Sequence, residues 1–186
     1  MQDSIVAVRY AKSLLTLAKE QNQLEEVYKD MLLFAKTSVE NPQLVRVLKS
    51  PVITHEKKKS ILSSIFSGKT GKMTLAFMDL LAKKGREGYL PQISDAFVKQ
   101  YKIMKGIQEA EVVTAAEISA TQKEELHSLI KKLSGKSLVE LTEKIDKSLL
   151  GGFILKVGDQ QIDQSVKGKI TSLKNKFKEN PYISKY

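Results

Sequence analysis

The 186-residue sequence contains no cysteine, so neither a disulfide framework nor a thiolate metal site can form. Histidine is scarce as well: His55 and His127 lie far apart in the sequence and have no flanking ligand pattern. A metal site typically needs three or four convergent ligands. We therefore expect neither a metal ion nor another cofactor, and we interpret both histidines as surface or helix-cap residues.

Long apolar runs are also missing from the chain. Stretches such as Met31 to Ala35 are far shorter than the about 20 residues that span a bilayer. The N-terminal segment does not read as a signal peptide, because charges at Arg9, Lys12 and Lys19 interrupt its apolar positions and no small-residue cleavage site follows. Any association with a membrane is therefore expected to be peripheral.

The sequence is rich in positive charge, with 31 basic and 21 acidic residues and a net charge of +10. Residues 1–105 hold 18 basic and 10 acidic residues, whereas residues 106–186 hold 13 and 11. Such a charge suits nucleic acid, acidic proteins or anionic lipid and does not choose among them. The run Lys57 to Lys59 keeps a nucleic-acid-binding protein open as the alternative function, although a solvated helix face is the commoner meaning of such a run.

No motif for catalysis stands out. The segment Gly68-Lys69-Thr70 superficially suggests a phosphate-binding loop, but position 63 is serine where that loop requires its first glycine. Neither a serine, histidine and carboxylate set nor a pair of carboxylates is arranged for nucleophilic or acid-base chemistry. We therefore expect the chain not to be an enzyme.

The first part of the chain has the periodicity of helices, and proline and glycine mark the helix ends. The pattern predicts six helices: Asp3–Gln21, Gln23–Glu40, a third opened by Asn41-Pro42, a fourth from Thr54 to near Gly68, Gly71–Lys84, and Leu90–Lys105. Short connections between six helices favour a compact bundle.

After Gly106 the pattern changes to alternating strands mixed with helices. Strand-like segments lie near Ile107–Val113, at Ser137–Ile145 and on both sides of Gly158-Asp159, with helices at Ala120–Leu133 and Ser165–Phe177. The sequence thus predicts an α+β protein, with a six-helix bundle over residues 1–105 and a small α/β domain with a mixed sheet over residues 106–186.

The first and fifth helices are unusually apolar. On a helical wheel the apolar arc of the first helix covers roughly 200°, whereas a helix that packs on one core shows a stripe a little over 100° wide. One explanation is that the two helices form the central pair of the bundle and are buried all round. The other is that a groove between them receives an amphipathic helix from a partner.

The segment from Gly151 to Ile170 carries the densest set of local signals: a glycine pair, two short strands around a tight turn, and Ser165 as a candidate helix cap. Together with residues just before it, this segment resembles the signature of the delta subunit of ATP synthases, called oligomycin sensitivity-conferring protein in mitochondria. The matching residues are Ile145-Asp146-Lys147-Ser148, Gly151, Gly152, Phe153, Gly158, Asp159, Ile162, Asp163, Ser165, Val166 and Gly168. Arg9-Tyr10-Ala11-Lys12 and Gly85-Arg86 match more weakly, and Glu87 departs from the leucine often found after Gly-Arg.

The resemblance implies a non-catalytic stator subunit of a proton-translocating ATP synthase. The helical domain would hold N-terminal helices of the alpha subunits, and the second domain would meet the b subunits of the peripheral stalk. By position, the groove candidates on this chain are Val6, Tyr10, Leu14, Leu17, Phe77, Met78 and Leu80. The expected location is peripheral, on the cytoplasmic face of a bacterial inner membrane. A processed organellar chain is the alternative, and the absence of an Arg- and Ser-rich leader favours the bacterial location.

Overall fold

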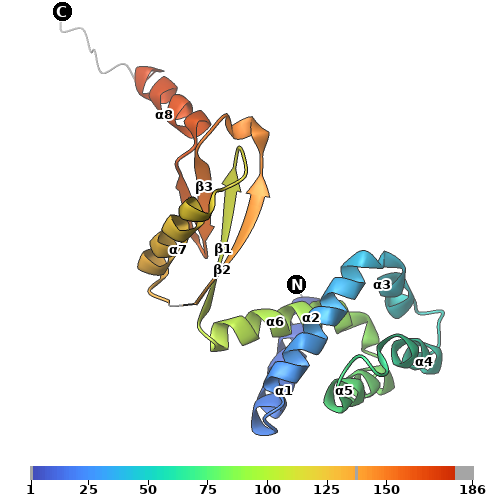
Figure 1. Ribbon diagram of the computed structural model, residues 1–186. Helices are drawn as coiled ribbons and strands as arrows, with labels where there is room; N and C mark the ends of the chain where they lie inside the picture. The colour runs from blue at the N-terminus through green and yellow to red at the C-terminus, as the bar shows by residue number, and fades with distance from the viewer. Residues whose placement is uncertain (1, 137, 179–186) are drawn as a thin grey trace, which may run out of the picture. The chain divides into compact units, whose positions relative to one another are not determined.

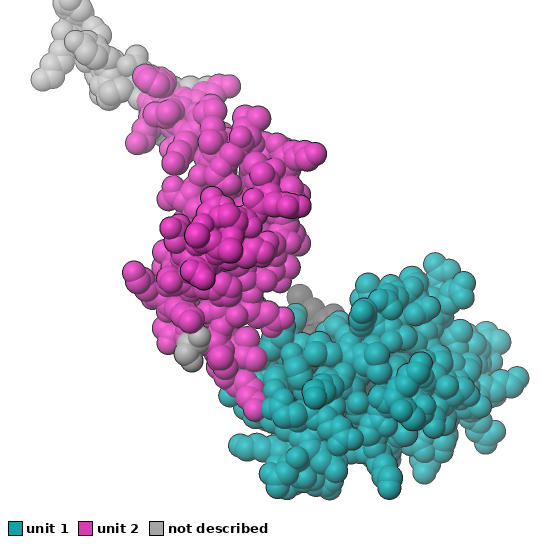
Figure 2. All heavy atoms as spheres, in the orientation of Figure 1, with its two compact units in different colours: residues 1–104 teal, residues 105–186 magenta. Residues whose placement is uncertain are grey.

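The computed structural model describes residues 2–136 and 138–178. The chain divides into two compact units, unit 1 within residues 1–104 and unit 2 within residues 105–186, which Figure 2 colours separately. Unit 1 is helical and unit 2 combines a sheet with helices (Figure 1). The expected α+β fold is confirmed. Ser137, where we expected the second strand to begin, lies outside the described residues.

The described part of unit 1 contains the six helices that the sequence predicts. They are α1 (Gln2–Glu20), α2 (Leu24–Glu40), α3 (Pro42–Lys49), α4 (His55–Phe66), α5 (Lys72–Lys83) and α6 (Leu90–Met104), with a short 3₁₀ turn, η1 (Glu87–Tyr89), before α6. Pro42 occupies the first turn of α3, as proline's fixed φ favours. Gly85 ends α5, where the Arg86 N–H donates to the Leu81 carbonyl at 2.8 Å.

The core of unit 1 forms around α6. This helix packs against both α1 and α2, while α5 packs mainly against α4. On α1, the side chains of Ala7, Ala11 and Ala18 are fully buried, and such small side chains let two helices approach closely. The expectation that α1 and α5 are a central pair buried all round is therefore wrong, because each helix packs mainly against a different neighbour and both keep exposed apolar side chains.

Unit 2 is built on a four-stranded mixed sheet with the strand order β2-β1-β3-β4. The strands are β1 (Ile107–Thr114), β2 (Leu138–Ile145), β3 (Phe153–Val157) and β4 (Gln160–Asp163). Strand β1 pairs parallel with β2 and antiparallel with β3, and β3 pairs antiparallel with β4. The parallel pair needs a long crossover, which α7 (Ala120–Ser134) supplies.

One face of the sheet packs against α7 (Figure 1). Val112 and Leu155 from the sheet and Ile130 from α7 are fully buried there. The other face carries charged residues, among them Glu111 and Lys144, which form an ion pair at 2.9 Å. Unit 2 therefore has a thin core on one side of its sheet.

The glycine-rich segment shapes the end of unit 2. Gly152 has a φ of +75°, and a Cβ atom at this position would overlap the Gln164 carbonyl oxygen. Ser165 accepts a hydrogen bond from the Gly168 N–H at 2.9 Å and donates its hydroxyl to Asp163 Oδ1 at 2.6 Å. The hydrogen bonds that the Ser165 hydroxyl and the Ser165 N–H donate to Asp163 Oδ1 hold the pKa of Asp163 below its usual value. The segment thus closes a hairpin and caps α8 (Val166–Lys178).

Candidate partner-binding surface

Five of the seven predicted groove residues are at least partly accessible on unit 1. Leu17 of α1 is 42% exposed and Leu80 of α5 is 46% exposed, while Val6, Tyr10 and Phe77 are half-buried. Val6, Tyr10 and Leu17 follow one another at spacings of four and seven residues, which places them on one side of α1. We call these five residues the α1–α5 surface.

The other two predicted residues lie in the core of unit 1. Leu14 is only 1% exposed and Met78 only 2% exposed. Neither side chain can meet a partner unless the bundle rearranges. The wide apolar arc of α1 is thus divided: one part packs inside the bundle, and the adjoining part with Val6, Tyr10 and Leu17 reaches the α1–α5 surface.

A cluster of three side chains joins α1 to α5 at this surface. The rings of Tyr10 and Phe77 meet edge to face with their centroids 6.5 Å apart. Arg86, just after α5, donates from Nη1 to the Tyr10 hydroxyl at 2.6 Å, and its guanidinium lies 5.5 Å from the centre of the Tyr10 ring. Both arrangements are favourable for aromatic rings. The cluster sets the spacing between the two helices before any partner binds.

The N-terminal end of α5 is fixed by a buried carboxylate of α2. Asp30 Oδ2 accepts hydrogen bonds from the Gly71 N–H at 2.8 Å and from the Thr74 hydroxyl at 2.6 Å. The N–H groups of a first helical turn have no partner within the helix, and negative charge is favourable at that end. Asp30 therefore accepts the hydrogen bonds donated at the start of α5 and holds that helix against α2.

The 3₁₀ turn after α5 is fixed by a buried ion pair. Lys58 of α4 donates to Glu87 Oε1 at 2.8 Å, and His55 Nδ1 lies 2.9 Å from the same oxygen. Glu87 and Lys58 are only 2% and 4% exposed. Burial raises the pKa of Glu87, but the hydrogen bonds from Lys58 and His55 outweigh burial and leave the pKa below its usual value.

Sequence reasoning missed this pair because Lys58 stands inside a run of lysines that suggested a solvated face. The helical period held the signal: Lys58, Leu62 and Phe66 follow at intervals of four on one face of α4, and all three are buried. Lys59 also has a partner, Asp79 of α5, at 2.6 Å. The run therefore does not present three neighbouring cations to a phosphate backbone, which removes its support for nucleic-acid binding.

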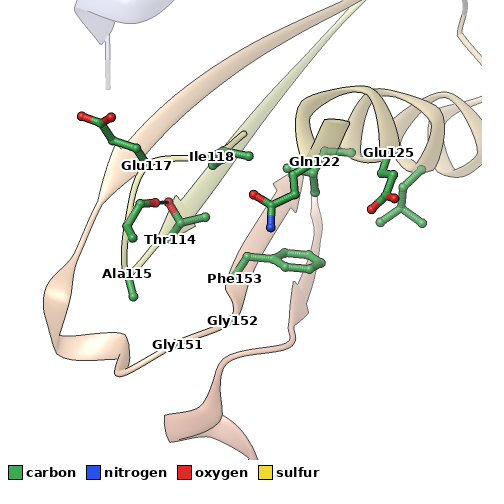
Figure 3. Close-up of a pocket in the computed structure, with 12 residues that line it drawn as sticks. Thr114, Ala115, Glu117, Ile118, Gln122, Glu125, Gly151, Gly152 and Phe153 are labelled. Atoms are coloured by element: carbon green, nitrogen blue, oxygen red, sulfur yellow. Dashed lines mark hydrogen bonds between the residues drawn. The ribbon is translucent and has the colours of Figure 1, made fainter. Parts of the chain in front are cut away.

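Unit 2 contains a hollow of about 550 Å³ that the sequence did not predict. Its walls come from the loop after β1, the first turns of α7 and the Gly151–Phe153 segment (Figure 3). Ile118, Leu126 and Phe153 give it an apolar lining, with Gln122 and Glu125 alongside. We call it the unit 2 hollow; its lining suits an apolar side chain.

None of the helices in the described ranges is both long enough and apolar enough to cross a bilayer.

Comparison with known proteins identifies the family. A family model described as the ATP synthase delta (OSCP) subunit matches residues 6–177. The chain is 43% identical to the ATP synthase subunit delta of Cytophaga hutchinsonii, over 96% of this chain and 97% of that protein. It is 31% identical to the chloroplastic ATP synthase subunit delta of Emiliania huxleyi, over 90% of this chain and 93% of that protein.

A solved structure shares the fold. A chain in the cryo-EM structure of the Toxoplasma gondii mitochondrial ATP synthase hexamer aligns with a TM-score of 0.71, over 92% of this chain and 96% of that one, at 23% identity. The expected family is confirmed by the family model and the sequence relatives, which cover this chain almost end to end. The chain therefore belongs to the ATP synthase delta (OSCP) subunit family and is a non-catalytic subunit of an ATP synthase complex.

Proposed function

We propose that this chain is a stator subunit that tethers the catalytic head of a proton-translocating ATP synthase to its peripheral stalk. Unit 1 binds N-terminal helices of the alpha subunits, and unit 2 binds the b subunits. The tether resists the torque on the head during ATP synthesis and takes no part in the chemistry. The observation that carries the proposal is the α1–α5 surface, which keeps apolar side chains accessible beside a well-packed core.

The chemistry of this surface suits an amphipathic helix. Such a helix would place apolar side chains at helical spacing between Leu17 of α1 and Leu80 of α5, which is a recurrent mode of peptide recognition. Burial of apolar surface contributes roughly 25 cal/mol per Å², and a stable specific interface buries about 800 Å² on each partner. The α1–α5 surface would form the apolar centre of such an interface.

Preorganisation of the α1–α5 surface favours tight binding. Arg86 is hydrogen-bonded to Tyr10, and Asp30 is hydrogen-bonded to the first turn of α5, so contacts within unit 1 already hold both helices. A partner helix would then lose its own freedom on binding but would not have to order this surface. A preorganised surface is also what a stator requires, because a compliant joint would yield under torque.

The excess of basic residues in positions 1–105 supports an acidic partner segment for unit 1. Charge of this kind mainly speeds encounter, and salt screens it. We expect association with the head to slow as ionic strength rises, while the apolar contacts keep the complex together once formed.

We place the subunit peripherally on the cytoplasmic face of a bacterial inner membrane. The higher identity to the Cytophaga hutchinsonii protein than to the chloroplastic protein of Emiliania huxleyi supports a bacterial setting. A processed organellar chain is the alternative.

The chain has no cysteine, so single cysteines can report its neighbours in the assembled ATP synthase. A photoactivatable cross-linker on Leu80→Cys should capture the alpha subunit. The matched control is Val52→Cys, which lies on unit 1 between α3 and α4 and is 87% exposed. Equal capture of the alpha subunit from both positions, or no capture from Leu80→Cys, would contradict the proposal for unit 1.

The same approach tests the stalk-binding role of unit 2. Leu138 on β2, Leu150 after η2 (Lys147–Leu149) and Phe177 on α8 are 52%, 74% and 85% exposed. Cross-linkers on Leu138→Cys, Leu150→Cys and Phe177→Cys should capture a b subunit from at least one position. If none of the three captures a b subunit, the proposed role of unit 2 fails.

A further inference from the structure

The last helix of unit 2, α8, carries an exposed apolar stripe. Val166, Ile170, Leu173 and Phe177 are 41%, 53%, 54% and 85% exposed. They follow at spacings of four, three and four residues, which is the pattern of alternating d and a positions in a coiled coil. At 100° per residue the four side chains fall within roughly 60° of the helix surface. We call these four residues the α8 seam.

Lysines flank the α8 seam on both sides. If Val166 occupies position d of a heptad, Lys167 and Lys174 occupy e, and Lys169 and Lys176 occupy g. All four are exposed. Every e and g position that the seam defines on α8 is thus a lysine, and the helix contains neither aspartate nor glutamate. In coiled coils these positions form the ion pairs that select the partner.

The start of α8 is tied to the body of unit 2. Ser165 and Asp163 cap the first turn, and the Val166 N–H donates to the Gly151 carbonyl at 3.0 Å. In Figure 1 the helix projects beyond the end of the sheet. The hairpin therefore presents α8 while most of its surface faces solvent.

We propose that α8 pairs with a partner helix to form a short coiled coil. The partner helix has apolar residues at its a and d positions and Asp or Glu at its e and g positions. The inference rests on the proposed stalk-binding role of unit 2 and assigns a surface and a partner chemistry to that role. Charge complementarity selects this occupant, because four lysines beside the seam favour four carboxylates opposite them.

Two other possible occupants fit the α8 seam less well. A second copy of α8 would place lysine against lysine, which is repulsive across a coiled coil. A helix that lies in a membrane surface needs a broad apolar face, whereas the α8 seam is narrow, as is typical of coiled coils.

The test uses the full-length chain labelled with ¹⁵N, because amide signals report weak binding residue by residue. The probe is a synthetic helical peptide of several heptads with leucine or isoleucine at a and d and glutamate at e and g. A control peptide has lysine at e and g. We expect the acidic peptide to shift the amide signals of α8 and to bind at least about tenfold more tightly than the basic peptide at low salt.

Charge reversal supplies the decisive variant. The double substitution Lys169→Glu and Lys176→Glu should reduce or reverse the preference between the two peptides. Asn175→Glu adds one negative charge on the opposite side of α8 and should leave the preference for the acidic peptide. Equal affinity for the two peptides, absence of shifts in α8, or self-association of the chain through α8 would each overturn the proposal.

These outcomes are distinct from failure of the proposed function. If Leu138→Cys or Leu150→Cys captures a b subunit while the acidic peptide does not bind α8, unit 2 meets the stalk through another surface. If α8 selects the acidic peptide but neither these two cysteines nor Phe177→Cys on α8 captures a b subunit, the α8 seam serves a different acidic helix.

Discussion

The two units of this chain differ in how their elements are held together. Unit 1 buries polar groups and pairs them across the bundle, as with Asp30 and α5 or Lys58 and Glu87. Unit 2 has a thin core on one side of its sheet, and it leaves the whole α8 seam exposed. The helices of unit 1 are therefore tied together by buried polar contacts, whereas α8 keeps an exposed apolar face.

The residues that identify the family are also different from the residues proposed to bind partners. The signature residues Gly152, Asp163, Ser165 and Gly168 build a hairpin and a helix cap in unit 2. None of them forms the α1–α5 surface or the α8 seam. A signature can thus specify how a surface is held without being part of that surface.

The largest effect is expected where a charge enters the core of unit 1. Leu14→Glu places a carboxylate at a site that is 1% exposed, and we expect a loss of more than about 4 kcal/mol in the free energy of unfolding. Leu17→Glu, one turn later on the same helix, is accessible and should cost less than about 1 kcal/mol. Urea denaturation followed by circular dichroism measures both. Similar losses for the two variants would place Leu17 in the core.

The buried ion pair is expected to give the next largest effect. Glu87→Gln leaves Lys58 charged, buried and without its carboxylate, which should cost about 3–5 kcal/mol. The control is Asp79→Asn, which removes a carboxylate from the pair with Lys59 near the surface, where the side chains are 44% and 40% exposed. That change should cost less than about 1 kcal/mol. If the two substitutions cost the same, the buried pair is not what fixes η1.

The pH dependence of stability sharpens the same comparison. The pKa of Glu87 is lower in the folded chain than in the unfolded one, where glutamate titrates near about 4.3. Ionised Glu87 therefore stabilises the fold fully above that unfolded value, and the contribution is lost as pH falls through the folded pKa. The difference in unfolding free energy between wild type and Glu87→Gln should shrink on acidification. A difference that stayed constant down to acid pH would contradict this assignment.

A smaller effect is expected at the hairpin of unit 2. Gly152 and Gly158 have φ values of +75° and +57°, so alanine at either position costs about 1 kcal/mol for the backbone. Gly152→Ala should cost more than Gly158→Ala, because its Cβ would also overlap the Gln164 carbonyl oxygen, while at Gly158 the nearest atom is 3.6 Å away. Hydrogen exchange of the α8 amides measures whether the cap loosens. Equal exchange in the two variants would show that the close approach at Gly152 does not hold α8.

Local patterns were enough to predict most of the fold. Pro42 and Gly85 mark helix ends, and alternation marks the strands on both sides of Gly158, because these preferences act over a few residues. The pairs that cross the bundle were invisible to such patterns. Arg86 and Tyr10 are 76 residues apart, and Glu87 and Lys58 are 29 apart.

The candidate site could likewise be predicted only in part. The excess apolar arc of α1 indicated that a second surface was needed, but the arc could not show which edge α6 covers. That is why Leu14 was included with the accessible residues although it lies in the core, and the pattern of α5 likewise could not show that Met78 is buried. The unit 2 hollow is lined by residues from the end of β1 and the loop after it, from α7 and from the Gly151–Phe153 segment, so no single stretch of the sequence predicts it.

The central claim is that the α1–α5 surface receives a helix of the alpha subunit. Isothermal titration calorimetry of the full-length chain with a peptide from the N-terminus of its alpha subunit tests it most directly, with Leu80→Glu as the variant. We expect the wild-type chain to bind the peptide and the variant to lose binding while its circular dichroism spectrum stays unchanged. Absence of wild-type binding at high micromolar peptide, or unchanged binding by the folded variant, would contradict the account.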